Sequence, residues 1–252
     1  MTPPEGFAAA CEGAGVELTP EEVHRLGRFL GMLLEANRAF NLTAIREPGE
    51  AWTRHVLDSL TLLSVLAEIE PREGQPVRVI DVGAGGGLPG VPLAIARPDV
   101  SVTLLDATAK KCAFLDNIAR ELGLTNVEVL CARAEAAGQD RGEKTGTGRV
   151  GARRDAYDLV VARAVGRLAT LCELTVPFAR VGGLIALIKG AKADEELEEA
   201  KQALHLLHAA HAGTVQTDTG RIVVLEKLRQ TPKLYPRRDG EPKRAPLGVP
   251  TN

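Results

Sequence analysis

VRVIDVGAGGGLPG, residues 77–90, is the stretch of sequence that decides the fold. A run rich in β-branched residues, 77–82, leads into a cluster of glycines and then into a helix-like stretch from Pro89. A buried strand, a glycine turn and a helix, in that order, bring bare backbone close to an adenosine-bearing ligand in α/β proteins. Asp81 lies two residues before Gly83, at the carboxyl end of this strand, where such sheets place their ligands.

Two classes of ligand are compatible with this turn. Residues 85–90 match the GxGxxG pattern of dinucleotide-binding proteins, whereas residues 81–87 match the acid-x-Gly-x-Gly-x-Gly pattern of S-adenosylmethionine (SAM) methyltransferases. A pyrophosphate needs free backbone N–H groups in the first helical turn, and Pro89 and Pro92 remove two of them. Because SAM carries no phosphate, the sequence favours SAM over a dinucleotide, and a turn without any ligand is the third alternative.

The composition limits the remaining possibilities. The chain has 252 residues, 44% of them hydrophobic, and a formal net charge of −2, so a nucleic-acid partner must be held by a local basic patch. No stretch approaches the ~18–20 apolar residues of a membrane span, and the N-terminus lacks the basic region of a signal peptide, so we expect a cytoplasmic protein. Four widely spaced cysteines, Cys11, Cys112, Cys131 and Cys172, are expected to be reduced core thiols, and no metal site is expected.

The first 70 residues are expected to form a helical extension. TPEE at 19–22 is typical of a capped helix start, and apolar residues at three- and four-residue spacing continue this helix to about residue 39. An extended segment at 41–45 and a second helical region at 48–68 follow. The second region carries His55, Asp58 and Ser59 close together along one helix. Their spacing alone favours a network that braces the helix over a place at the mouth of the cofactor site.

Residues 71–228 alternate strands with helices, as a mostly parallel, doubly wound α/β sheet requires. Strands are expected at 77–82, 100–105, 127–131, 158–162 and 184–188, with a closing hairpin of 215–217 and 221–228, and helices at about 89–97, 108–122, 168–179 and 193–209. Two segments are expected to be mobile: a glycine-rich, charged loop at 138–155, and a proline-rich tail at 229–252 with six basic and two acidic residues. The tail is either disordered or an arm that binds phosphate.

Right-handed crossovers place the carboxyl ends of the parallel strands at one edge of the sheet. Asp106 ends the second strand, about 23 residues after Gly83, where a carboxylate can accept hydrogen bonds from ribose hydroxyls. Ala134 and Glu135 follow the third strand, in a position to bracket an adenine. Arg163 ends the fourth strand and is placed to meet the SAM carboxylate or a substrate phosphate.

The strand ends also lack two features of other methyltransferases. Strand 158–162 continues as ARAV at 162–165 instead of the Asn/Asp-Pro-Pro-aromatic clamp that methylation of an exocyclic amino group needs, and no Cys-Pro nucleophile lies at a strand end. An acceptor with its own lone pair, such as N7 of guanine, needs no proton removed, so catalysis is mainly positioning. Methylation of a small molecule and a non-catalytic dinucleotide-binding module stay open as alternatives.

Seven motifs together resemble the bacterial small-subunit ribosomal RNA guanine-N7 methyltransferases, the glucose-inhibited division protein B family. They are NLTAI (41–45), RHVLDSL (54–60), VIDVGAGGGLPGVPLAI (79–95), LLDATAKKCAFL (104–115), ARAV (162–165), IKG (188–190) and TPKLYPRRDGEP (231–242). The resemblance implies a Rossmann-like class I SAM-dependent methyltransferase fold with a helical N-terminal extension. It also implies SAM as cofactor and, as acceptor, a guanine near the decoding region of 16S ribosomal RNA (rRNA), in free RNA or the 30S particle, with neither DNA nor membrane as partner.

The resemblance assigns roles to individual residues. Cofactor binding is expected of Asp81, Gly83, Ala84, Gly85, Leu88, Asp106, Ala107, Thr108, Ala134, Glu135 and Arg163, and Arg163 is also the candidate catalytic residue. Substrate binding is expected of Asn41, His55, Lys189, Lys233, Tyr235, Arg237 and Arg238. Tyr235 in its basic surroundings suits RNA, with Phe40 and Trp52 as further stacking candidates. We therefore expect removal of residues 230–252 to weaken RNA binding and to leave SAM binding nearly unchanged.

Overall fold

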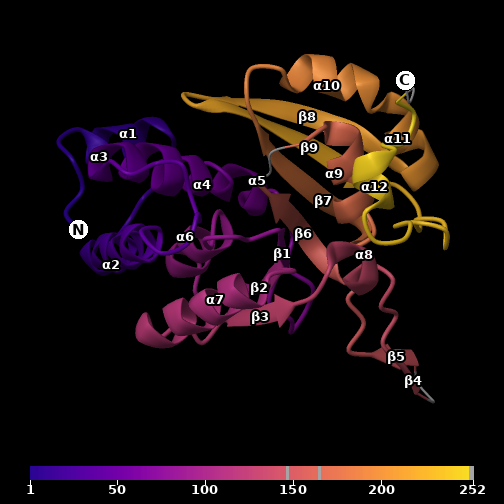
Figure 1. Ribbon diagram of the computed structural model, residues 1–252, viewed down its shortest axis with the longest axis horizontal. Coiled ribbons are helices and arrows are strands. Elements are labelled where there is room, and N and C mark those ends of the chain that lie inside the picture. Colours follow the sequence, from indigo (N-terminus) through magenta and orange to yellow (C-terminus); the bar gives the residue numbers. More distant parts are fainter. Residues whose placement is uncertain (146–147, 164–165, 250–252) are drawn as a thin grey trace.

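The computed structural model describes residues 1–145, 148–163 and 166–249 of the chain. A seven-stranded sheet runs through the centre of the molecule (Figure 1). In spatial order its strands are β3 (Val127–Cys131), β2 (Ser101–Asp106), β1 (Arg78–Val82), β6 (Tyr157–Ala162), β7 (Ala179–Lys189), β9 (Gly220–Lys227) and β8 (Ala209–Thr217). Five strands pair in parallel and β9 runs antiparallel to both of its neighbours. The predicted mostly parallel α/β sheet is confirmed.

The strand positions follow the sequence prediction closely, apart from two early starts. β7 begins at Ala179 because this residue pairs with Tyr157 ahead of a shift in register. β8 begins at Ala209, where the sequence analysis expected the end of a helix. In the β1–β2 ladder Asp81 lies opposite Leu104, so the turns that follow the two strands meet at one edge of the sheet.

Helices cover both faces of this sheet. The domain contains α6 (Gly90–Ala96), α7 (Ala109–Glu121), α8 (Ala134–Ala137), α9 (Leu168–Thr175), α10 (Ala193–Glu199) and α11 (Lys201–Leu207). The helix expected over 193–209 is thus two helices joined at Ala200. Val79 of β1 packs into one apolar cluster with the N-terminal helices, α6 and α7, and its neighbour Ile80 packs into a second cluster with α9, α10 and α11. Burial on both faces is typical of a parallel sheet.

The N-terminal helices lie together on one side of the sheet (Figure 1). They are α1 (Phe7–Gly13), α2 (Pro20–Ala36), α3 (Pro48–Ala51), a π-helical turn η1 (Trp52–Leu57), α4 (Asp58–Leu60) and α5 (Leu63–Ala67). The predicted start of α2 is confirmed, because the Thr19 and Glu22 side chains form a reciprocal capping box. Its apolar face is fully buried through Leu26, Phe29, Leu30 and Leu33, each worth about 1.5–3 kcal/mol.

The second helical region is not the single helix that its spacing predicts. The helix widens into the π turn at 52–57 and breaks after Leu60. Two backbone carbonyls of the π turn accept hydrogen bonds from side chains: Arg54 O from Arg163 Nη1 at 2.6 Å, and His55 O from Ser59 Oγ at 2.5 Å. These side-chain donors accompany the irregular turn, and such turns are frequent at functional sites.

The described parts of the two segments predicted to be mobile, 138–145, 148–155 and 229–249, have defined places in the fold, and residues 146–147 and 250–252 lie outside the described residues. The loop 138–155 carries a hairpin of β4 (Glu143–Thr145) and β5 (Gly148–Val150) and ends in the buried Arg154. The C-terminal segment runs back along α8 and α9 and includes α12 (Glu241–Arg244), which is the yellow helix beside α9 in Figure 1. Its Tyr235 is buried in the second apolar cluster. The expectation of a free tail is therefore wrong for residues 229–249.

Three of the four cysteines are buried, as expected, but Cys131 is exposed at the end of β3. Its side chain lies within hydrogen-bonding reach of Cys112, and burial together with this contact raises the pKa of Cys112 to about 12. In the described ranges, no helix is both long enough and apolar enough to cross a membrane.

Candidate functional site

The glycine turn after β1 has the backbone that its composition predicts. Gly83, Gly85 and Gly87 adopt φ values of +80°, +56° and +91°, which side chains rarely allow. The amides of Gly83 and Ala84 both donate to the carbonyl of Leu105, at 2.8 and 2.9 Å. The turn is thereby fastened to the end of β2, and its bare backbone faces the carboxyl edge of the sheet.

Asp81 lies directly beneath this turn and is fully buried. Its Oδ2 accepts a hydrogen bond from the Gly90 amide at 2.8 Å, and a Cβ at Gly90 would clash with Leu104 and lie 2.9 Å from the same Oδ2. Burial raises the pKa of Asp81 to about 7. Oδ1 has no hydrogen-bond partner among the described residues. A buried acceptor of this kind fits the ammonium group of SAM, which would supply the missing donor.

Asp106 occupies the predicted position at the end of β2. Its Oδ1 accepts from the Thr108 amide at 2.8 Å and its Oδ2 from the Gly85 amide at 3.1 Å, while Lys111 lies 3.7 Å from Oδ2. These contacts fix the carboxylate at the edge of the sheet, with oxygen lone pairs left for the hydroxyls of a ribose.

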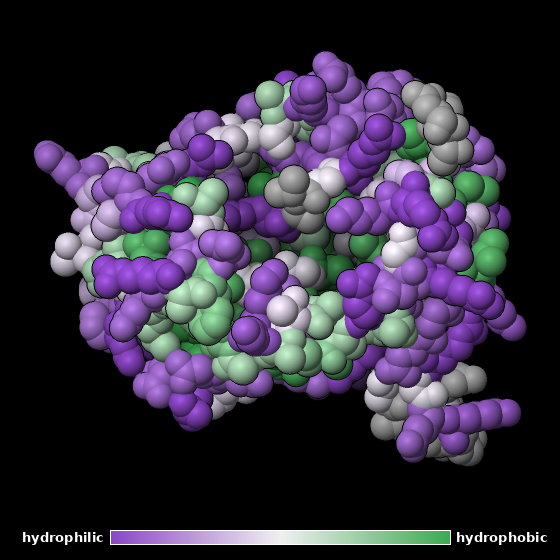
Figure 2. Space-filling view, in the orientation of Figure 1, coloured by the Kyte–Doolittle hydropathy of each residue, from purple (hydrophilic) through white to green (hydrophobic). Residues whose placement is uncertain are grey.

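A cavity of about 820 Å³ opens beside these groups. It brings together five of the predicted cofactor residues, Gly83, Asp106, Ala107, Ala134 and Glu135. The volume suits a nucleoside-sized ligand. Figure 2 shows a hollow in the middle of this face with hydrophobic residues at its floor and hydrophilic residues around its rim. Six predicted cofactor residues are not among those that line the cavity: Asp81, Ala84, Gly85, Leu88, Thr108 and Arg163. Ala84, Gly85 and Leu88 belong to the glycine turn, Asp81 lies beneath it, and the amide of Thr108 donates to Asp106.

Arg163 extends from the end of β6 towards the N-terminal helices instead of into the cavity. Its Nη1 donates to the Arg54 carbonyl at 2.6 Å, and its Nη2 lies 2.7 Å from Nδ1 of His55. Nδ1 also lies 3.2 Å from the Arg54 carbonyl, but the shorter contact with Nη2, which can only donate, makes Nδ1 an acceptor. The ring proton then sits on Nε2, which donates to Oγ1 of Thr43 at 2.8 Å. Arg163 is thus linked through a neutral histidine to the NLTAI loop.

Burial and the neighbouring Arg163 lower the pKa of His55 to about 4. The loop at the other end of this chain of hydrogen bonds is held by Asn37, whose side chain bonds the backbone of Leu42 and Thr43. Asp58 completes the cluster: Oδ1 accepts from the Thr219 hydroxyl, and Oδ2 lies 3.8 Å from Nη1 of Arg163. RHVLDSL and NLTAI therefore act together to place Arg163.

The predicted substrate residues fall into two groups. Asn41, Lys233 and Arg238 are exposed and available to a large ligand. His55, Lys189, Tyr235 and Arg237 are not: His55 is 1% exposed, Lys189 pairs with Glu196 at 2.8 Å, Tyr235 packs in the core, and Arg237 is held by Glu173. The polar atoms or rings of these four side chains are engaged inside the protein, so direct RNA contact by them stays a prediction that this structure does not favour. Of the stacking candidates, Trp52 is also buried, whereas Phe40 is 42% exposed.

Sequence reasoning missed one wall of the cavity. Thr170, Leu171 and Leu174 of α9 face a part of the C-terminal segment across it, and that part contributes Gly240, Lys243, Arg244, Pro246 and Val249. The only signal in the sequence was the TPKLYPRRDGEP motif, which was interpreted as an RNA-binding arm. Within the part of the chain that the structure covers, no cluster of three or more His, Cys, Asp or Glu side chains could hold a metal ion.

Comparison with known proteins gives concordant matches along the chain. The family profile described as GidB, rRNA small subunit methyltransferase G, matches residues 22–223. A protein named ribosomal RNA small subunit methyltransferase G from Sorangium cellulosum is 50% identical over 238 residues, which cover 94% of this chain and 93% of that protein. Its namesake from Leuconostoc citreum is 36% identical over 248 residues, covering 96% and 98%.

Among solved structures, the CMeT domain of citrinin polyketide synthase is similar, with a TM-score of 0.53 and 12% sequence identity. The match covers 79% of this chain and 57% of that one. At this identity the likeness shows the fold alone.

Proposed function

Because this chain belongs to the rRNA small subunit methyltransferase G family, we propose that it transfers the methyl group of SAM to N7 of a guanine in 16S rRNA, near the decoding region. The protein is a SAM-dependent rRNA methyltransferase with the predicted Rossmann-like class I fold. The acceptor atom and the position in the RNA are the new parts of the proposal. We also place the enzyme in the cytoplasm, acting on free 16S rRNA or an assembling 30S particle and not on DNA or membranes.

The observation that carries the choice of N7 is the state of the three titratable groups beside the end of β6. Arg163 is a cation and a donor, His55 is neutral with Nδ1 occupied by Arg163, and Asp58 accepts from Thr219. None of these three is placed to take a proton from a substrate: Arg163 is a donor, the accepting nitrogen of His55 is occupied, and Asp58 is bound to Thr219. The remaining carboxyl group nearby, Asp81, is fully buried beneath the glycine turn and does not line the cavity. The cluster therefore suits an acceptor atom that has its own lone pair and loses no proton, and N7 of guanine is such an atom. SAM, when bound, supplies the electrophilic methyl group, and the protein contributes orientation.

The surface near this cluster has groups suited to an unpaired RNA strand. Phe40 is exposed beside Asn41 in the loop that leads to Thr43, and Arg38 and Arg46 are exposed on the same loop. A stacked aromatic ring with neighbouring cations is typical of single-strand RNA binding. Arg167 is exposed at the rim of the SAM cavity. Together these residues support a path for RNA across the sheet edge, from the NLTAI loop to the cavity.

The proposal is tested by mapping 7-methylguanosine in 16S rRNA from cells that lack this protein. We expect one modified guanine near the decoding region to become unmethylated, and to be restored by the native protein but not by the Arg163→Ala variant. Purified enzyme should then methylate the same base in naked 16S rRNA or in 30S particles from the deletion strain. An unchanged pattern of 7-methylguanosine, or methylation of another atom, would overturn the proposal.

A further inference from the structure

The C-terminal segment beyond residue 238 has no role in the functions described so far, and it lies outside the 22–223 range of the family match. We infer that residues 240–249 form a wall of the SAM cavity and help to bind the adenosine part of the cofactor. This inference rests on SAM being the cofactor, and it reverses the expectation that removal of the tail leaves SAM binding nearly unchanged.

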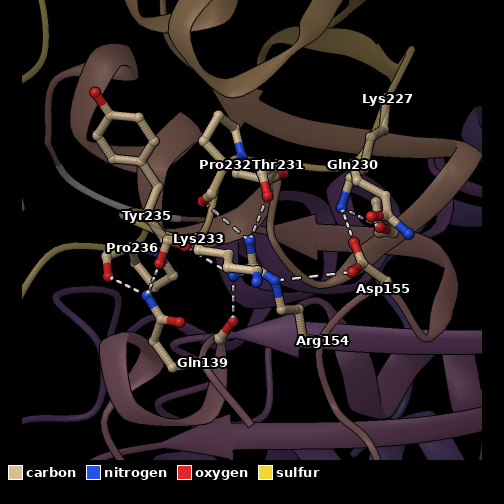
Figure 3. Close-up of polar contacts among 12 residues, drawn as sticks. Gln139, Arg154, Asp155, Lys227, Gln230, Thr231, Pro232, Lys233, Tyr235 and Pro236 are labelled. Carbon is tan, nitrogen blue, oxygen red and sulfur yellow. Dashed lines mark hydrogen bonds and ion pairs between the residues drawn. The ribbon is translucent and has the colours of Figure 1, made fainter. Parts of the chain in front are cut away.

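The first part of the segment is fixed by a buried arginine (Figure 3). Arg154, which is 4% exposed, donates to four carbonyls: those of Gly138, Thr231 and Tyr235 at 2.7–2.9 Å, and that of Pro232 at 3.2 Å. Gln139 of the same loop donates to the carbonyls of Lys233 and Pro236. One guanidinium and one amide therefore hold residues 231–236 against the end of α8.

The next part is fixed by a second buried charge, on α9. Glu173 is fully buried and accepts from the backbone amide of Arg237 at 2.7 Å and from its Nε and Nη2 at 2.9 and 2.6 Å. Nη2 of Arg237 also donates to the Ala245 carbonyl at 2.7 Å. The same side chain therefore links the residue before the turn into α12 to the residue that follows this helix. Such a bidentate ion pair leaves the backbone at Arg237 little conformational freedom.

The last contacts reach the cofactor residues themselves. The amide of Gly240 donates to Oε1 of Glu135 at 3.1 Å, and Asp239 pairs with Arg133. The hydroxyl of Thr170 donates to the Pro242 carbonyl at 3.1 Å. Glu135 was expected to face the adenine, and the C-terminal segment now fixes one of its two carboxylate oxygens.

The resulting wall has the chemistry of an adenine slot. Pro246 and Val249 line the cavity together with Leu171 and Leu174 of α9, and Glu135 contributes an acceptor to the same cavity. Flat apolar surfaces suit the faces of a purine, and a carboxylate suits its amino group. Asp106, expected to bind the ribose, is part of the same lining. The segment thus lies where the adenosine half of SAM would be.

Two matched substitutions in the full-length protein test the inference without RNA. Val249→Glu places a carboxylate in the wall, whereas Leu234→Glu adds the same charge to the same segment at a side chain that is 68% exposed and lies outside this cavity. Calorimetric titration with SAM and with S-adenosylhomocysteine should show at least tenfold weaker binding for Val249→Glu and less than twofold change for Leu234→Glu. If the glutamate variant folds poorly, Val249→Ala replaces it in the test. We expect its SAM affinity to be about threefold lower than that of the native protein.

Equal SAM affinity in the folded Val249→Glu variant and the native protein would overturn the inference. The same holds if rRNA affinity falls while SAM affinity is unchanged, because the segment would then be an RNA-binding arm. Failure of the rRNA assignment leaves a different signature: SAM affinity responds to Val249→Glu as expected, but the native protein methylates no 16S rRNA.

Discussion

The N-terminal helices and the C-terminal segment border the same sheet edge from opposite sides, yet different forces hold them. The N-terminal helices pack through fully buried apolar side chains such as Phe29, Leu33 and Trp52. The C-terminal segment is held mainly by two buried charges, Arg154 and Glu173, that bind its backbone and Arg237. An apolar helix face can be predicted from the spacing of its residues along the chain. A polar segment that is held by charges far away in the sequence has the composition of a disordered tail.

The largest effect is expected from breaking the polar attachment. Glu173→Ala removes the buried partner of Arg237, and loss of one member of such a pair costs about 3–5 kcal/mol. We expect a matching drop in the free energy of unfolding in urea, faster tryptic cleavage after Arg237 and Arg238, and weaker SAM binding. As a control, Glu198→Ala breaks an exposed pair with Lys201 and should change stability by less than about 1 kcal/mol. Equal proteolysis of the two variants would show that the segment is held by other contacts.

The second effect probes the contribution of the N-terminal side to catalysis. Arg163→Ala should lower the turnover of rRNA methylation by about 100- to 1000-fold, the range seen when one positioned donor is removed from a site. The free energy of unfolding should fall by less than the loss of transition-state stabilisation that this drop in turnover represents. Arg120→Ala, at an exposed arginine of α7, is the control. If turnover and SAM affinity both stay unchanged in Arg163→Ala, this residue does not belong to the site.

The third effect is a pH dependence located in the N-terminal cluster. The pKa of His55 is about 4 in the folded protein and 6.5 in the unfolded chain, where the side chain makes no fixed contacts. Between these two pH values the unfolded chain therefore binds more protons than the folded protein. The contribution to stability is complete above pH 6.5 and falls by about 3 kcal/mol as the pH drops to 4. Asp81, whose pKa is raised, acts in the opposite direction, and the difference between native and His55→Gln proteins isolates the histidine. His24→Gln, at an exposed histidine, should leave the profile unchanged.

The smallest effect concerns recognition of RNA. Stacking of one base on an aromatic ring is worth about 1–3 kcal/mol, so Phe40→Ala should weaken the binding of 16S rRNA by that amount. SAM affinity and the unfolding midpoint should stay close to the native values, because Phe40 is exposed. Leu234→Ala serves as a control at another exposed apolar side chain. Native rRNA affinity in Phe40→Ala would remove the NLTAI loop from the RNA path.

The features predicted correctly from the sequence are those whose cause is local. The glycine turn needs positive φ angles, the strands alternate with helices, and Asp81 and Asp106 lie at the carboxyl ends of β1 and β2, so neighbouring residues were enough to place them. The roles of Tyr235 and Arg237 were missed because their partners lie far along the chain: Arg154 is 81 residues from Tyr235, and Glu173 is 64 residues from Arg237. No pattern near position 235 indicates that a distant buried guanidinium will donate hydrogen bonds to the backbone there.

The same limit applies at His55. Its spacing to Asp58 and Ser59 correctly indicated a bracing cluster, but only the fold shows that Arg163, 108 residues away, occupies its Nδ1. In this structure the histidine therefore holds another side chain, Arg163, in place. Sequence alone located the residues of this cluster and left the direction of its hydrogen bonds open.

Asp58 joins the N-terminal extension to two distant positions of the sheet domain. It lies on α4, binds Thr219 at the tip of the β8–β9 hairpin and sits beside Arg163 at the end of β6. The first 70 residues also share one apolar cluster with β1, β2 and β6. Heat should therefore melt the extension and the sheet in a single cooperative transition, and a chain that begins at residue 71 should not reach the native state.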